Sequence, residues 1–224
     1  MCLLLETIKI ENGKIRNLEY HNRRFNSSRR EKFGGTGEMD AGASGPGMMD
    51  TGEADPATGD YIDLSSVITI PSELGSGIFR CRILYQREIV KIEFVPHEDL
   101  MVKSLKLVHS DDIDYSLKYA DREFLKSLFE LREKCDEILI VKNGFITDTS
   151  ISNIVFRRQD GSWVTPDTPL LNGTMRMNLL EAGRINEATM RPGDLGGFTG
   201  ARMINCMMGL DSGPVIEMSR IFAD

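Results

Sequence analysis

The sequence has 224 residues, a formal net charge of -7, 41% hydrophobic residues and 27% charged residues. This composition is typical of a globular protein, and the length is enough for one large domain or two small ones. The negative charge argues against a surface for nucleic acid or anionic membranes. No apolar run approaches the roughly 20 residues that span a bilayer.

The first six residues lack a basic segment and are too short for a signal peptide. The cysteines are scattered, without a CxxC pair, at Cys2, Cys81, Cys135 and Cys206. This pattern favours free thiols in a reducing compartment over disulfides or a metal site. We therefore expect a cytoplasmic protein without a bound metal.

The N-terminal part predicts a β-hairpin followed by a helix. Residues 3–10 and 15–18 flank Asn12-Gly13, a turn pair that tolerates positive φ. Residues 20–32 are then predicted as a helix rich in Arg and Asn.

A surface insertion and a second hairpin follow. Residues 34–60 are rich in Gly, Asp, Pro, Thr and Met, and have little apolar surface to bury. Residues 78–85 and 88–95 are rich in β-formers, and their alternation puts Arg80 and Arg82 on one face.

The C-terminal part begins after a link at residues 96–99 and is richer in strands. We predict a helix over 119–133, a strand over 137–141, a hairpin at Asp160-Gly161, a helix over 175–182 ended by Gly183, and a last core strand over 201–208. The fold class is therefore α+β, with an N-terminal domain over 1–100 and a C-terminal domain over 101–224.

The most informative segment is residues 144–156, in which one strand leads through a Thr/Ser-rich turn into another. Asp148 ends the first strand beside many N–H and hydroxyl donors. Such a turn can hold a cofactor with a cationic ring at one end and a phosphate at the other. Leu117-Lys118 lies upstream of it, and residues 170–176 (LLNGTMR) lie downstream.

These three pieces, in this order, resemble the class IV aminotransferase family, the pyridoxal-phosphate enzymes of fold type IV. The family includes branched-chain and D-amino-acid aminotransferases and aminodeoxychorismate lyase. The resemblance covers residues 6–217 except for 34–60. It implies a small N-terminal α/β sandwich, a larger strand-rich, barrel-like C-terminal domain, and a homodimer. The sequence begins at the family's Glu-Thr-Ile strand, as expected of an N-terminally short member.

The resemblance assigns the central chemistry to three residues. Lys118 would form the Schiff base with pyridoxal 5'-phosphate. Asp148 would face the pyridine nitrogen, where the family usually has the longer Glu. Arg24, in a His-x-x-Arg-x-x-x-Ser pattern, would bind the phosphate through its planar fork. Taken alone, these residues also suit a surface lysine, a turn-forming aspartate and a charged helix face.

The resemblance also implies further residues around the cofactor. Its phosphate would lie near the opening of a helix, where N–H groups favour anions. The candidates for binding the cofactor are Thr149, Ser150, Gly173, Thr174, Met175 and Asn205, with Leu171 packing under the ring. Arg80 and Arg82 are candidates for a substrate carboxylate, although a solvent-facing side of the hairpin explains them slightly better. We expect Cys206 to lie in a buried strand.

Three functions remain open at this stage. The first is an aminotransferase acting on a small amino acid and a 2-oxo acid. The second is aminodeoxychorismate lyase, which releases pyruvate and an aromatic amine, and towards which residues 117–122 (LKYADR) lean. The third is a catalytically silent homologue. All three imply small-molecule ligands, with no nucleic acid and no membrane.

Overall fold

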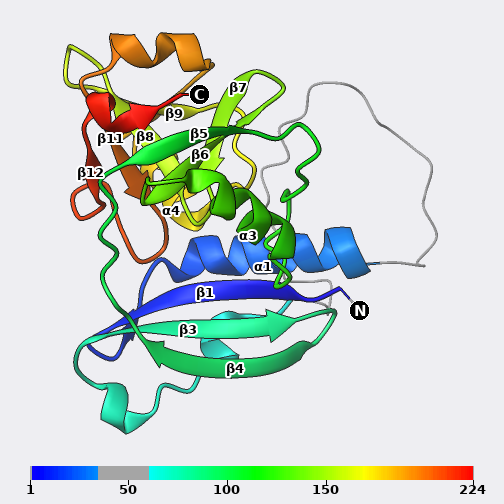
Figure 1. The fold of residues 1–224 in the computed structure, drawn as a ribbon. Helices are drawn as coiled ribbons and strands as arrows, with labels where there is room; N and C mark the ends of the chain where they lie inside the picture. Colours follow the sequence, from blue (N-terminus) through cyan, green and yellow to red (C-terminus); the bar gives the residue numbers. More distant parts are fainter. Residues whose placement is uncertain (1, 35–60, 224) are drawn as a thin grey trace.

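The computed structural model describes residues 2–34 and 61–223. The predicted insertion over 34–60 lies outside this range except for Gly34. Within it, the chain forms a mixed α/β fold rich in strands (Figure 1). No helix in the described part is long and apolar enough to cross a membrane.

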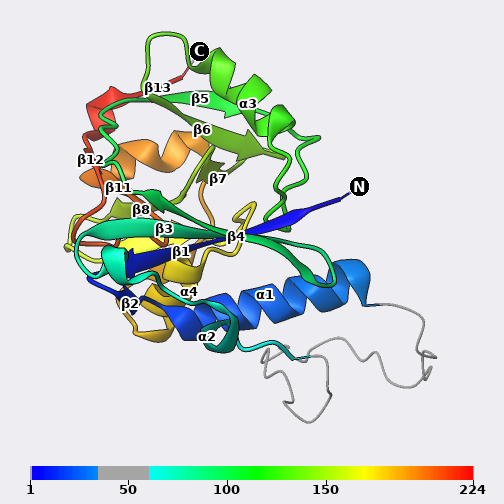
Figure 2. The ribbon, with the colours of Figure 1, turned by 90° about the horizontal axis from the view of Figure 1, so that it is seen from below.

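The N-terminal sheet is antiparallel and has the strand order β2-β1-β3-β4. Its strands are β1 (Leu4–Glu11), β2 (Lys14–Ile15), β3 (Ile78–Tyr85) and β4 (Ile89–Pro96). Helix α1 (Leu18–Phe33) packs on it, and the short α2 (Leu64–Val67) lies against α1 (Figure 2). The predicted turn at Asn12-Gly13 is confirmed, with φ values of 50° and 70°.

Two further sheets make up the C-terminal part. One has the order β13-β5-β6-β7, built from β5 (Leu105–His109), β6 (Glu137–Lys142), β7 (Phe145–Thr149) and β13 (Ile221–Phe222). The other has the order β10-β9-β8-β11-β12, built from β8 (Asn153–Arg157), β9 (Trp163–Pro166), β10 (Asn186–Ala188), β11 (Gly200–Ile204) and β12 (Val215–Ile216).

These two sheets share one hydrophobic core. Leu139 and Ile146 of the first sheet cluster with Phe156 and Met203 of the second, and all four are fully buried. The N-terminal sheet has a core of its own around Ile8, with Phe25 from α1. The predicted domain boundary near residue 100 falls between β4 and β5 and stays a prediction.

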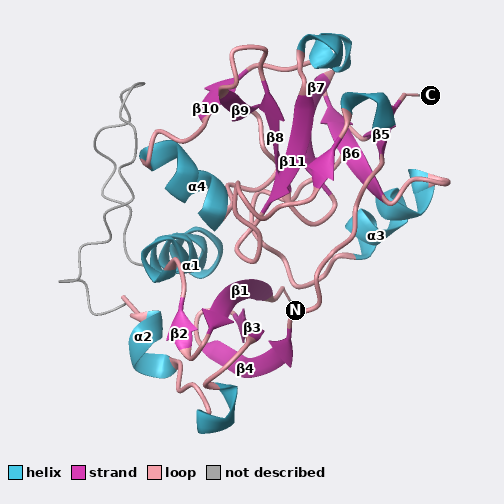
Figure 3. Ribbon diagram, turned by 90° about the vertical axis from the view of Figure 1, so that its left-hand side faces the viewer, coloured by secondary structure: helices cyan, strands magenta, loops and turns pink. Residues whose placement is uncertain are grey.

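Helix α1 lies between the N-terminal sheet and α4 (Thr174–Glu181), as Figure 3 shows. The amide of Asn17 donates to the carbonyl of Thr174 (3.0 Å), and the Tyr20 hydroxyl donates to Glu181 (2.9 Å). The two parts of the chain are therefore joined through these helices.

The helix predicted over 119–133 is wrong at both ends. Helix α3 covers only Glu123–Phe129, and a 3-10 turn follows it over Glu130–Arg132. The preceding residues bond to the edge of β1 instead: the Leu5 N–H donates to the Lys118 carbonyl (2.9 Å), and Tyr119 pairs with Leu4. Backbone groups used in this way are not available for helical hydrogen bonds.

The last core strand is also shorter than predicted. Strand β11 ends at Ile204, and the chain then turns sharply, with Asn205 and Met208 exchanging two backbone hydrogen bonds (2.9 and 3.0 Å). The Asn205 side chain accepts a bond from the Met207 N–H (2.9 Å). An Asn side chain that bonds the backbone two residues on favours a turn over a strand. Cys206 therefore lies in a tight turn, not in a strand.

The N-terminal core generates a stability prediction. Phe25 is fully buried, and its ring centroid lies 4.4 Å from that of Tyr85. We expect Phe25→Ala to lower the free energy of unfolding by about 3–5 kcal/mol, because it leaves a cavity. Urea unfolding measures this loss. Phe124→Ala is the control: its side chain is 50% exposed, and the expected loss is below about 1 kcal/mol. Equal losses in the two variants would contradict this account.

Candidate active site

A hollow between the N-terminal and C-terminal parts contains most of the predicted site residues, and we call it the Lys118 hollow. Its lining comes from α1, from the segment before α3, from the β7–β8 turn, from the start of α4, and from the turn after β11. The lining residues are Arg24, Tyr115, Lys118, Arg122, Leu125, Asp148, Thr149, Ser150, Ile151, Ser152, Asn153, Leu170, Leu171, Gly173, Thr174, Asn205 and Cys206.

Lys118 is half-buried in this hollow. Burial lowers the pKa of its amine from 10.5 to about 8, and the positive charges of Arg24 and Arg122 act in the same direction. The expectation that Lys118 opens a helix is wrong, because its carbonyl bonds to β1. The lowered pKa leaves a larger share of neutral, nucleophilic amine at neutral pH than a surface lysine has.

Asp148 is the last residue but one of β7 and is 5% exposed. Its two carboxylate oxygens accept hydrogen bonds from the Leu171 N–H (3.0 Å) and the Asn153 amide (2.8 Å). Burial raises the pKa of Asp148 from 3.8 to about 6, although these two bonds oppose the rise. Asp148 is therefore ionised at neutral pH and holds the loop that leads into α4.

Asn153 and Gly173 bring that loop close to β8. The Asn153 amide also donates to the Leu171 carbonyl (2.8 Å). A Cβ at position 173 would lie 2.0 Å from the Asn153 side-chain oxygen, so only glycine fits. Helix α4 starts at Thr174, and both Gly173 and Thr174 line the hollow. The first N–H groups of a helix have no partner within the helix, which suits them to an anion.

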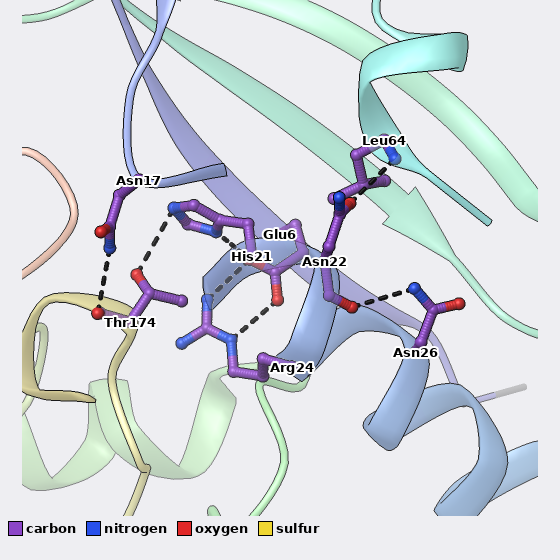
Figure 4. A network of polar contacts seen from close by, with 8 residues as sticks. All are labelled: Glu6, Asn17, His21, Asn22, Arg24, Asn26, Leu64 and Thr174. Carbon is purple, nitrogen blue, oxygen red and sulfur yellow. Dashed lines mark hydrogen bonds and ion pairs between the residues drawn. The ribbon is translucent and has the colours of Figure 1, made fainter. Parts of the chain in front are cut away.

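Arg24 takes part in a buried network with Glu6 and His21 (Figure 4). Its Nε and Nη2 donate to the two oxygens of Glu6 (2.8 and 2.6 Å). Nδ1 of His21 lies 2.8 Å from Glu6, and Nε2 lies 3.4 Å from the Thr174 hydroxyl. Glu6 and His21 are fully buried. The network therefore links β1, α1 and the start of α4 beside the hollow.

The neighbouring groups of this network shift one another's pKa values. Burial by itself raises the pKa of Glu6, but Arg24 and His21 outweigh burial and hold it at about 2. Burial lowers the pKa of His21, and the hydrogen bond between His21 and Glu6 opposes this lowering. A neutral His21 that donates from Nδ1 to Glu6 leaves Nε2 to accept from Thr174.

The predicted hydroxyl donors are engaged within the protein. The Thr149 hydroxyl bonds to Ser152 (2.9 Å), and the Ser150 hydroxyl donates to the buried Glu137 (2.9 Å). The Asn205 side chain accepts bonds from its own turn. These residues line the hollow, and their side-chain hydrogen bonds to other residues of the protein shape its walls.

Three predicted residues do not line the hollow. Met175 packs in a hydrophobic cluster with Leu179. Arg80 donates to the Pro96 carbonyl (3.3 Å), and Arg82 pairs with Glu93 across the hairpin (2.8 Å). Neither Arg80 nor Arg82 lines the hollow, although Arg82 lines a wider groove beside it. The roles of both arginines in binding stay predictions.

Sequence reasoning missed several residues of the site, among them Glu6, Tyr115, Arg122, Asn153 and Cys206. A signal for Glu6 was present, because the alternation of β1 puts its carboxylate on the same face as Leu4 and Ile8. An acidic residue on a core face demands a buried cationic partner. The position of Cys206 depends on a turn that the sequence pattern did not indicate.

Comparison with known proteins identifies the family to which the chain is similar. The model of the family described as amino-transferase class IV matches residues 115–212. An uncharacterized protein of Haemophilus influenzae is 40% identical over 210 residues, covering 94% of this chain and 100% of that protein. A crystal structure from Haemophilus somnus, provisionally named a 4-amino-4-deoxychorismate lyase, shares 36% identity with a TM-score of 0.77, covering 94% of this chain and 98% of that one.

A more distant structure supports the fold alone. A hypothetical aminotransferase from Mycobacterium tuberculosis, in a PLP-bound form, shares 16% identity with a TM-score of 0.68, covering 99% of this chain and 84% of that chain. Together with the closer matches, it confirms the predicted fold type IV class. The chain belongs to the class IV aminotransferase family of pyridoxal-phosphate-dependent enzymes, which includes aminotransferases and aminodeoxychorismate lyases.

The buried Glu6 generates a prediction about pH and stability. Its pKa is about 2 in the folded protein against 4.5 unfolded, so its contribution to stability is present above pH 4.5 and lost as the pH falls towards 2. Between pH 5 and pH 3, we expect the wild type to lose about 2 kcal/mol more unfolding free energy than Glu6→Gln. Urea unfolding at both pH values measures this difference.

The matched control is Glu19→Gln, because the Glu19 side chain on α1 is 76% exposed. Its pH dependence is expected to follow the wild type. If Glu6→Gln lost as much stability as the wild type over this interval, the Glu6 carboxylate would not be the group held ionised by Arg24.

Proposed function

We propose that the Lys118 hollow binds pyridoxal 5'-phosphate and that Lys118 is the amine to which the cofactor links. The observation that carries this proposal is the grouping of three chemically distinct side chains around one hollow: the amine of Lys118, the carboxylate of Asp148 and the guanidinium of Arg24. This set fits the cofactor, which has an aldehyde, a basic ring nitrogen and a phosphate. When bound, the cofactor withdraws electrons from the substrate carbon that carries the amino group.

The residues divide the binding task by charge. The cationic Arg24 and the N–H groups at the start of α4 suit the phosphate. Asp148, ionised above pH about 6, suits a protonated ring nitrogen. Leu171 suits the face of the ring. Because Glu6 holds Arg24 by two hydrogen bonds, the guanidinium is oriented before any ligand arrives.

Lys118 also supplies the acid–base group. Once released from the cofactor, its amine can take the proton from the substrate carbon. Its pKa of about 8 lies near neutral pH, where a group can both accept and return a proton efficiently. Asp148 is tied to Leu171 and Asn153, so Lys118 is the better placed of the two for this step.

Of the family's reactions, we propose the lyase reaction on 4-amino-4-deoxychorismate. A proton leaves the carbon that bears the amine, the bond from the ring to the enolpyruvyl oxygen breaks with its electron pair on oxygen, and the enol gains a proton on carbon. The products are 4-aminobenzoate and pyruvate. The full-length relative with 36% identity, provisionally named as this lyase, supports the choice. The same site chemistry suits an aminotransferase, which remains the second candidate.

The proposal also includes a homodimer that acts on small molecules, carried over from the family resemblance, and a cytoplasmic location, inferred from the cysteines. The cysteines Cys2, Cys81, Cys135 and Cys206 are free thiols in the structure, consistent with a reducing compartment.

The first test concerns Lys118. Adding pyridoxal 5'-phosphate to the purified protein is expected to give an absorbance band that borohydride removes, with the reduced adduct mapping to Lys118 by peptide mass spectrometry. Because only the neutral amine reacts, the rate of linkage should rise with pH through about 8, not through 10.5. Lys118→Ala should abolish the adduct. Lys126→Ala, an exposed lysine of α3, should not. An adduct on another lysine would overturn the assignment.

The second test concerns the reaction. The cofactor-loaded protein is expected to form equal amounts of pyruvate and 4-aminobenzoate from 4-amino-4-deoxychorismate, without any added amino acceptor. Coupled lactate dehydrogenase follows the pyruvate, and chromatography follows the aromatic product. If an amino acid instead converts the cofactor to its amine form and no pyruvate appears from this substrate, the aminotransferase is the better assignment. If neither reaction occurs in a protein that links the cofactor, the catalytically silent homologue is the better assignment.

A further inference from the structure

Arg122 is a cation of the Lys118 hollow that the proposed cofactor contacts leave unused. Arg122 lies just before α3 and lines the hollow next to Tyr115 and Leu125. It also lines the wider groove beside the hollow, which residues 113–125 form with the start of the chain and with Arg82 and Leu84 of β3. Arg122 therefore lies where the hollow and this groove meet.

The guanidinium of Arg122 is held at one nitrogen and unsatisfied at another. Its Nη2 donates to the carbonyl of Ser150 (2.5 Å). Its Nε is buried and has no hydrogen-bond partner within residues 2–34 and 61–223. A buried donor without a partner is costly, and the cost is larger when the group is charged. An orphan of this kind points to a ligand that supplies the missing acceptor.

No acidic side chain of the described residues forms an ion pair with Arg122. Glu137 lies behind Ser150, but its oxygens accept from the Ile138 N–H (2.8 Å) and the Ser150 hydroxyl (2.9 Å). These bonds fix the segment that anchors the Arg122 guanidinium. The other arginine of the hollow, Arg24, already has its carboxylate in Glu6.

The missing acceptor is therefore expected to be an anion brought by the substrate. A planar guanidinium is suited to a carboxylate, which can accept from Nε while Nη2 stays on Ser150. We propose that Arg122 binds a carboxylate of the substrate and so orients the amine towards Lys118. This inference rests on the proposed function, because it takes the substrate of the Lys118 hollow to be an amino carboxylate. Arg122 lines the hollow itself, whereas Arg82 lines only the groove beside it and Arg80 lines neither.

The test compares a charged with an uncharged probe. Calorimetry on the cofactor-loaded protein gives dissociation constants for 4-aminobenzoate and for 4-aminobenzamide, which lacks the carboxylate. The wild type should bind the acid more tightly than the amide. In Arg122→Gln, binding of the acid should weaken by about tenfold or more, with the amide changed by less than about twofold. A purely structural role for Arg122 would weaken both probes alike.

Two further variants sharpen the comparison. Arg184→Gln is the matched control, since Arg184 is an exposed arginine paired with Asp211 outside the hollow, and it should leave both constants unchanged. Arg82→Gln tests the alternative that Arg82 of the hairpin binds the substrate carboxylate. Should Arg122→Gln fail to fold, Arg122→Lys keeps the charge but loses Nε, and a smaller fall in the preference for the acid is expected.

The inference is overturned if the wild type binds the amide as tightly as the acid, or if neither probe binds. It is also overturned if the Arg122 variants keep the wild-type preference for the acid, or if Arg82→Gln loses that preference instead. The absorbance band of the Lys118-linked cofactor, recorded on the same samples, reports separately on the proposed function. A protein with the band but without the Arg122 effect would keep the proposed cofactor site and lose only the carboxylate contact.

Discussion

The buried ion pair between Glu6 and Arg24 is the interaction on which the arrangement of the site depends. A fully buried carboxylate is tolerable only when it is paired and hydrogen-bonded, and Glu6 has Arg24 and His21 for this purpose. The pairing fixes α1 on β1 at one rotation and one depth. The neighbouring residue, Leu5, holds the Lys118 carbonyl through its N–H. One short stretch of β1 therefore sets the positions of both the arginine and the lysine.

A second buried carboxylate does the corresponding work in the C-terminal part. Asp148 and Asn153, at the facing ends of β7 and β8, hold the backbone of Leu171 from both sides. This contact brings the start of α4 to the hollow, and Asn17 and Tyr20 of α1 then bind α4 directly. The site lies between the two parts because each part contributes groups that the other lacks: cationic residues on α1, and a carboxylate and helix N–H groups beyond β7.

The local charge of the hollow differs from that of the whole chain. The net charge is -7, yet the hollow is lined by Arg24, Lys118 and Arg122, with Asp148 as the acid in its lining. Concentrated positive charge attracts anionic ligands. Burial is the main cause of the lowered pKa of Lys118, and the charges of Arg24 and Arg122 add to it. One grouping of side chains thus favours anion binding and makes the amine reactive. Such coupling of ligand binding to a shifted pKa is common at functional sites.

The sequence by itself determined the fold class, the two hairpins of the N-terminal sheet and helix α1. It also indicated the motifs that contain Arg24, Lys118, Asp148 and Gly173. These depend on local periodicity, turn chemistry and motif order, all of which are written along the chain. The tertiary structure alone decided that residues 117–120 leave the helical path to bond β1, and that the chain turns at Asn205–Met208. It also decided that Arg122 lines the hollow, that Glu6 pairs with Arg24 beside it, and that Arg80 and Arg82 do not line it. The physical reason is that backbone hydrogen bonds and buried charges must find partners, and those partners are distant in the sequence and meet only when the sheets and helices have packed.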